Sequence, residues 1–169
     1  MKRIPLFLGA LGVLLLAFGT SFGAAKSVFR AALSGSEEVP AHTTAAKGHA
    51  VFTLEKDGTE ISYRLVVNNI TNATVAHIHA GNPGETGAPV VTLYGPVAAG
   101  GGKKSGLLSS GTIHASDLTG TLAGKTIADL VAEMNSGHTY VNVHTDDGVG
   151  EANRGPGDFP DGEIRGQIH

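Results

Sequence analysis

The chain has 169 residues, with 12 basic and 15 acidic side chains and a formal net charge of −3 at pH 7. Beyond the N-terminus no basic cluster is larger than the pair Lys103 and Lys104, so nucleic acid is not an expected partner. The sequence contains no cysteine. This excludes disulfide bonds and thiolate metal sites, and any metal must be held by histidine, carboxylate or backbone oxygen.

The first 25 residues have the pattern of a secretory signal peptide. Two basic residues precede an apolar run over residues 6–18, and Ala25 ends a stretch of small residues. The run is shorter than the roughly 20 residues that cross a bilayer. We expect residues 1–25 to be removed and residues 26–169 to form one domain without a membrane span. The mature domain is then secreted, periplasmic or at the cell surface, and its partner there is left open.

Short β-branched runs separated by glycine predict antiparallel strands. Strict alternation predicts a hairpin with strands over 50–54 and 61–67 that reverses at Asp57 and Gly58, because Asp-Gly supplies the positive φ angles of a tight turn. Further strands are expected over residues 28–33, 73–79, 89–94, 107–114, 139–144 and 162–168. Three segments rich in glycine, proline or polar residues are expected to be loops: 34–46, 95–105 and 145–161.

One helix is predicted between the last two of the loop segments. Apolar residues recur at helical spacing over residues 127–134, Thr126 and Asp129 can form a capping box, and Gly137 follows the end. One helix among about eight short strands indicates an all-β fold, an antiparallel Greek-key β-sandwich or flattened barrel.

The stretch "ATVAHIHAG" (73–81) places two histidines at strand spacing. Ile78 is expected on the core side, so His77 and His79 point to the opposite face. In "TYVNVHT" (139–145) Val141 is likewise expected in the core, and the same alternation turns His144 outward with Tyr140 and Asn142. If the two strands are neighbours, three neutral imidazoles can converge on one ion at bonds of about 2.0 Å. Nitrogen ligands of this kind suit copper or zinc.

Two further histidines are candidates for a fourth ligand. His49 points away from the apolar face of its strand, and His169 lies on the polar side of the last strand. The alternative interpretation of His77, His79 and His144 is that they are surface residues without a ligand, because a His-x-His pattern also occurs by chance.

Other charged residues predict less. Glu163 and Arg165 share one strand face and favour a solvated cross-strand pair, with anion binding as the alternative. The acidic residues of 145–161 lack the fixed order of a calcium loop, so a solvated loop is expected there.

Six ordered motifs resemble those of the CHRD domain, a module of many secreted bacterial proteins. They are "LSGSEEVP" (33–40), "HIHAG" (77–81), "GAPVVTLYG" (87–95), "SGTIHASDLTG" (110–120), "TYVNVHT" (139–145) and "GEIRGQI" (162–168). The resemblance spans the mature chain, residues 26–169. It implies an extracellular β-sandwich without a well-defined biochemical activity.

A fainter resemblance is to copper/zinc superoxide dismutase. It implies that His77 and His79 correspond to a copper-binding strand pair, His144 to a late-strand ligand, and Arg154 to a residue that guides an anionic substrate. The cysteine pair, a clear bridging histidine and the zinc loop of that enzyme are absent from the sequence. The expected β-sandwich or flattened barrel is superoxide-dismutase-like or immunoglobulin-like. The first hypothesis is a non-catalytic exported module that holds a copper-type ion, and the alternative is a copper-dependent redox enzyme.

Overall fold

A computed structural model describes residues 27–169, and the predicted signal peptide, residues 1–25, lies outside the described residues. The strands are β1 (Val28–Ser34), β2 (Lys47–Leu54), β3 (Ile61–Thr71), β4 (Ala73–Ala80), β5 (Pro89–Tyr94), β6 (Lys103–Ile113), β7 (Thr139–Thr145) and β8 (Ile164–Gln167). One α-helix, α1 (Ile127–Asn135), and three short 3-10 helices (Gly35–Glu37, Ala115–Asp117 and Gly120–Leu122) complete the described elements.

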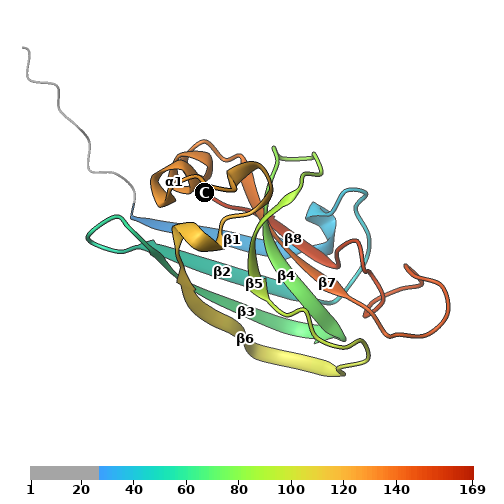
Figure 1. Ribbon diagram of the computed structural model, residues 1–169. Helices are drawn as coiled ribbons and strands as arrows, with labels where there is room; N and C mark the ends of the chain where they lie inside the picture. The colour runs from blue at the N-terminus through green and yellow to red at the C-terminus, as the bar shows by residue number, and fades with distance from the viewer. Residues whose placement is uncertain (1–26) are drawn as a thin grey trace, which may run out of the picture.

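The strands form one nearly closed antiparallel sheet in the order β5-β4-β7-β8-β1-β2-β3-β6. Side chains bridge the seam between β5 and β6. The hydroxyls of Tyr63 and Ser109 both donate to the carbonyl oxygen of Leu93, at 2.7 and 2.6 Å. The result is a flattened barrel (Figure 1), which confirms the predicted all-β class with about eight strands and one helix.

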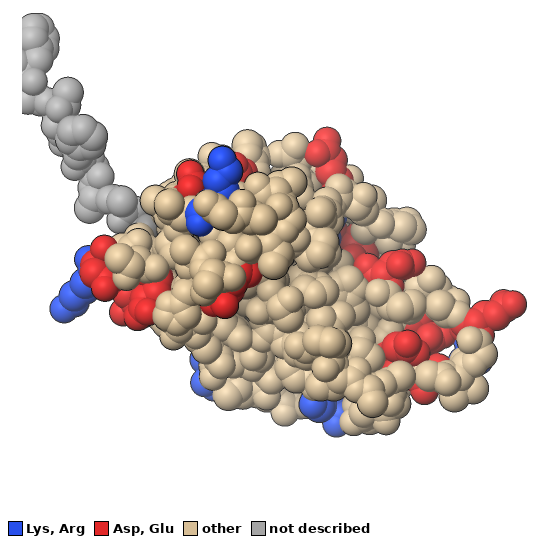
Figure 2. All heavy atoms as spheres, viewed as in Figure 1, with Lys and Arg blue, Asp and Glu red and all other residues tan. Residues whose placement is uncertain are grey.

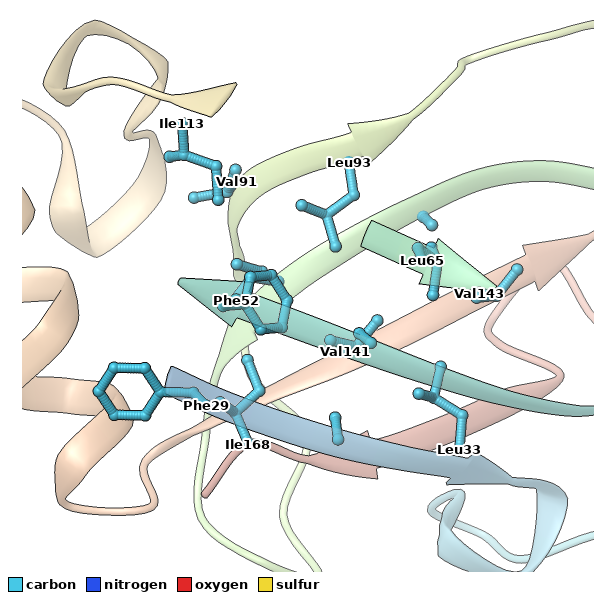
Figure 3. Packing of buried hydrophobic residues seen from close by; sticks show 14 of the residues in the cluster. Phe29, Leu33, Phe52, Leu65, Val91, Leu93, Ile113, Val141, Val143 and Ile168 are labelled. Atoms are coloured by element: carbon cyan, nitrogen blue, oxygen red, sulfur yellow. The ribbon is translucent and has the colours of Figure 1, made fainter. Parts of the chain in front are cut away.

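Buried apolar side chains from the strands fill the barrel interior. Figure 3 shows Phe29, Phe52 and Ile168 close together, with Val141 next to them and Val143 farther along the interior. All five are fully buried. Burial of this apolar area is the main stabilising contribution to the fold, since the chain has no disulfide.

The helix begins where its capping box was predicted. Asp129 N–H donates to the Thr126 hydroxyl oxygen at 3.3 Å, and the Thr126 backbone N–H donates to Asp129 Oδ2 at 2.8 Å. Gly137 has a φ of 70° just past the end of the helix. Figure 1 shows α1 at one end of the barrel and the loop after β7 protruding at the other.

Two local predictions were wrong. The hairpin turn between β2 and β3 has a positive φ at Gly58 alone, because Asp57 instead uses its side chain to accept from the Thr59 N–H. The segment 95–105 is not all loop, since β6 begins at Lys103. Its polar start pairs with the end of β3 across a register shift, next to a positive φ at Gly106. An outer strand tolerates polar residues and a bulge of this kind.

Candidate metal centre

Strands β4 and β7 are paired neighbours and bring three histidines to one face. In this register Ile78 pairs with Val141 and His79 with Tyr140. Ile78 and Val141 are fully buried in the core, so the alternation of the strands sends His77, His79 and His144 to the outer face. The predicted orientation of all three side chains is therefore observed.

The three imidazoles lie close together. One ring nitrogen from each of His77, His79 and His144 lies within 4.8 Å of the other two. His77 Nδ1 and His144 Nε2 are 3.4 Å apart. Two ligands of one ion, at bonds of about 2.0 Å and tetrahedral to trigonal angles, lie about 3.3–3.5 Å apart. The spacing of this pair matches that of two nitrogen ligands on one ion.

Backbone carbonyls fix the tautomers of two of these histidines. His79 Nδ1 lies 2.9 Å from the carbonyl oxygen of Gly87, and His144 Nδ1 lies 2.8 Å from that of Pro160. A carbonyl only accepts, so both Nδ1 atoms carry the proton and both Nε2 atoms keep a lone pair. The Nε2 of His79 is buried and has no hydrogen-bond partner. Donation of Nδ1–H to a carbonyl is the usual outer support of a metal-ligating histidine.

Burial keeps the three rings neutral. It is the largest cause that lowers the pKa of each, and for His79 it lowers the pKa to about 4. Proximity of His144 lowers the pKa of His77 and His79 further. A neutral imidazole is the form that binds a metal. At neutral pH, protons therefore do not compete with a metal ion for these ring nitrogens.

Two loops cover the histidines. The loop between β4 and β5 contributes Gly87, and the loop between β7 and β8 contributes Pro160. The second loop is anchored by Glu163, whose buried carboxylate accepts from the Thr44 and Thr145 hydroxyls and from the Gly157 N–H at 2.6, 2.8 and 2.8 Å. Segments from distant parts of the chain therefore hold the cluster in place.

The two candidates for a fourth ligand lie elsewhere. His49 is exposed on β2, opposite Ala32 of β1 and Val66 of β3. His169 is exposed, and its backbone pairs with Arg30. Neither belongs to the histidine cluster.

Arg154 is held by carboxylates of its own loop. Its Nη2 lies 3.0 Å from Asp147 Oδ2, and its Nε lies 3.4 Å from Asp158 Oδ2. Carboxylate oxygens of Asp146, Asp147 and Asp158 lie within 4.8 Å of one another, and Arg154 supplies a cation to this group. Figure 2 shows acidic side chains gathered at this end of the molecule.

Glu163 and Arg165 are not a solvated pair, and that expectation was wrong. Both side chains are buried. The Arg165 guanidinium stacks on the ring of Tyr140, with its Cζ 3.5 Å from the ring centroid, and it donates to the carbonyls of Asn82 and Glu85. The two loops cover this face of β8, which a strand pattern alone does not reveal.

Sequence reasoning also missed Glu38. It lies in the segment before β2, is buried, and approaches Asn142 of β7. The one available signal was its place in the motif "LSGSEEVP" (33–40), which was interpreted only as part of the family resemblance.

Fold and site together define an all-β domain with a partly buried three-histidine cluster on the outer face of its sheet. A profile of the CHRD domain family matches residues 29–168. The chain therefore belongs to the CHRD domain family, as the ordered motifs predicted. Searches of curated proteins and of solved structures found no significant match. Within residues 27–169, no helix has the length and apolar character needed to cross a membrane.

Proposed function

We propose that this chain is an exported CHRD module that binds one copper-type ion through His77, His79 and His144. The observation that carries the proposal is the convergence of three ring nitrogens within 4.8 Å, with two tautomers set by loop carbonyls. A buried Nε2 without a partner, on His79, is costly unless something binds it.

The donor set favours copper over the other common ions. Three imidazole nitrogens suit copper and zinc, whereas calcium and magnesium prefer oxygen ligands. Between the two, the usual order of affinities places Cu²⁺ above Zn²⁺. The ligands would be Nδ1 of His77 and Nε2 of His79 and His144. When bound, the ion would supply Lewis acidity or redox chemistry, while the chain holds the three rings in fixed planes.

The proposal is tested by titrating the metal-free protein with Cu²⁺ and Zn²⁺ in a calorimeter and recording the electron paramagnetic resonance spectrum of the copper form. We expect one site with a Kd below about 1 µM and nitrogen hyperfine structure. His79→Ala and His144→Ala should each remove it. Binding weaker than micromolar, or binding that survives both substitutions, would contradict the proposal.

The matched controls are His49→Ala and His114→Ala. Both histidines are exposed, and neither belongs to the cluster. Their substitution removes one imidazole from the surface without touching the proposed ligands, so copper affinity should stay within about twofold of the parent. If either control lowers affinity as much as His144→Ala does, the bound copper lies elsewhere.

The alternative of a superoxide-dismutase-like enzyme has no specific support here. It assigns Arg154 the task of guiding an anionic substrate, whereas the Arg154 guanidinium is paired with Asp147 and Asp158. A superoxide assay of the copper-loaded protein separates the two functions. A binding module gives no turnover above that of free copper held by a chelator.

A further inference from the structure

A small cavity lies beside the histidine cluster. Its volume is about 320 Å³, and its polar lining comes from Glu38, His79, Tyr140, Asn142, Asp161 and Arg165. Ligand pockets in proteins begin at roughly 300 Å³. At about 30 Å³ for each water molecule, this volume suits a compact ligand of about ten non-hydrogen atoms.

Three acceptors at this cavity have no partner. Among residues 27–169, four buried side-chain polar atoms lack a hydrogen bond, and three of the four belong to residues that line the cavity: Glu38 Oε1, Asn142 Oδ1 and His79 Nε2, the last a proposed metal ligand. The Glu38 and Asn142 side chains are more than nine-tenths buried. The Asn142 amide donates to Glu38 Oε2 at 3.4 Å, which leaves its oxygen as the free end. Buried acceptors without a donor are rare in folded proteins, and a pair of them at one cavity indicates a missing donor.

The buried unpaired groups of the cavity are acceptors, whereas the exposed Thr86 hydroxyl in its lining can donate or accept. The cation in the lining, Arg165, is already used, because its Nη atoms donate to the carbonyls of Glu85 and Asn82 at 2.7 and 3.0 Å. Glu38 and Asp161 add two carboxyl groups to the wall. A ligand that complements this wall carries positive charge and several N–H donors, and an anion is disfavoured.

We propose that this cavity binds the primary ammonium group of a small organic amine, which donates to the Glu38 carboxylate and to Asn142 Oδ1. The last torsion of a glutamate side chain is broad and soft, so either carboxylate oxygen can turn toward the ligand. The alkyl part of the amine lies against Val39 and Pro40, which line the same cavity. No metal ion takes part in this contact, so the inference goes beyond the proposed metal site and can fail separately from it.

The test uses n-butylammonium as the probe and metal-free protein, so that the amine cannot bind through a metal. Backbone amide chemical shifts are followed by NMR at constant ionic strength. We expect saturable shifts at Val39, Gly87 and Arg165 with n-butylammonium, and none with butyrate or 1-butanol, which match its chain length without the charge. Nα-acetyl-lysine amide, compared with n-butylammonium, distinguishes a protein side chain from a free amine as the preferred source of the group.

Glu38→Gln keeps the shape of the side chain and removes its charge, and we expect it to weaken n-butylammonium binding at least tenfold. Glu37→Gln is the matched control, since Glu37 is the adjacent carboxylate and is exposed. Equal binding of n-butylammonium, butyrate and 1-butanol, no saturable shift with n-butylammonium, or an unchanged affinity in Glu38→Gln would overturn the proposal. If a protonated Glu38 donates to Asn142 Oδ1, both acceptors are satisfied without a ligand, and n-butylammonium would then cause no saturable shift. If Glu38→Gln does not fold, the probe comparison on the parent chain still decides.

Discussion

The imidazole of His79 lies almost parallel to the ring of Tyr140, with ring centroids 4.9 Å apart and an interplanar angle of 11°. The Tyr140 hydroxyl accepts from the Gly87 N–H at 3.0 Å, and the Gly87 carbonyl accepts from His79 Nδ1 at 2.9 Å. One tyrosine therefore supports both the plane of His79 and the carbonyl that sets its tautomer.

Removing the hydroxyl of this tyrosine should weaken metal binding. Tyr140→Phe keeps the stacked ring and loses the bond to Gly87, so the carbonyl that orients His79 is less well held. Because outer-shell partners typically change metal affinity by about 10- to 100-fold, we expect a loss of about tenfold in copper affinity by calorimetry. The control is Tyr63→Phe, which loses a hydroxyl at the β5–β6 seam and should leave the affinity unchanged. Equal affinities in both variants would contradict this role of Tyr140.

Gly87 tolerates no side chain. A Cβ at this position would lie 1.6 Å from the carbonyl oxygen of Ala80, so Gly87→Ala must displace the loop. We expect copper affinity to fall at least tenfold and the free energy of unfolding to fall by about 1–3 kcal/mol. Gly101→Ala is the matched control, because a Cβ there meets no atom within 4 Å. A Gly87→Ala protein with parental copper affinity would show that the loop carbonyl is dispensable.

Glu38 should make the stability of the protein depend on pH. The pKa of Glu38 is raised from 4.5 to about 7. Burial is the largest cause of this rise, and Arg165 and the hydrogen bond from Asn142 oppose it. Because the folded-state pKa exceeds the unfolded one, the folded protein binds the proton more tightly. The contribution of this group to stability is therefore fully present below about pH 4.5 and is lost as the pH rises through about 7.

Glu38→Gln removes this dependence. At about pH 8 we expect the variant to exceed the parent in free energy of unfolding by up to about 3 kcal/mol, and the difference to shrink toward zero near pH 4.5. Urea unfolding at the two pH values measures it, with Glu37→Gln as the control. A parent and variant that differ equally at both pH values would refute the raised pKa. Destabilisation by a residue that a ligand requires is a common trade-off at binding sites.

Glu163 should affect stability and the metal site together. Glu163 is 1 % exposed. Its carboxylate accepts hydrogen bonds from Thr44 and Thr145, which lie outside the loop before β8, and from Gly157 within that loop. Glu163→Gln turns one acceptor into a donor that faces other donors. We expect a loss of about 3 kcal/mol in unfolding free energy by urea titration and weaker copper binding. Glu151→Gln, an exposed change in the same loop, should alter neither, and a similar loss there would contradict the assignment.

The faces of the strands could be predicted because side-chain alternation is a local property of extended backbone. Ile78 and Val141 were assigned to the core and His144 to the outer face by counting residues, and the structure agrees. That the strands bearing His79 and His144 are neighbours did not follow from the alternation. It depends on the order of strands in the sheet, which the sequence pattern does not specify, so the hypothesis of a shared site was conditional on it.

The outer support of the histidines could not be predicted. Gly87 and Pro160 act through backbone carbonyls, and the direction of a loop carbonyl depends on φ and ψ angles that residue type does not specify. The paths of the loops could not be predicted either, and Glu163 and Arg165 were therefore expected to be solvated. Their burial results from loops that fold over β8, whereas strand alternation describes only the strand itself.

The position of β8 has a consequence for the order in which the centre is assembled. This strand is inserted between β7 and β1, and Pro160, which orients His144, lies just before it. A nascent polypeptide that has emerged only as far as β4 already displays His77 and His79, yet it has neither the third ligand nor the carbonyl behind it. Under the proposed function, uptake of the ion is deferred until the barrel is nearly complete, because a partial chain lacks the arrangement that would bind it.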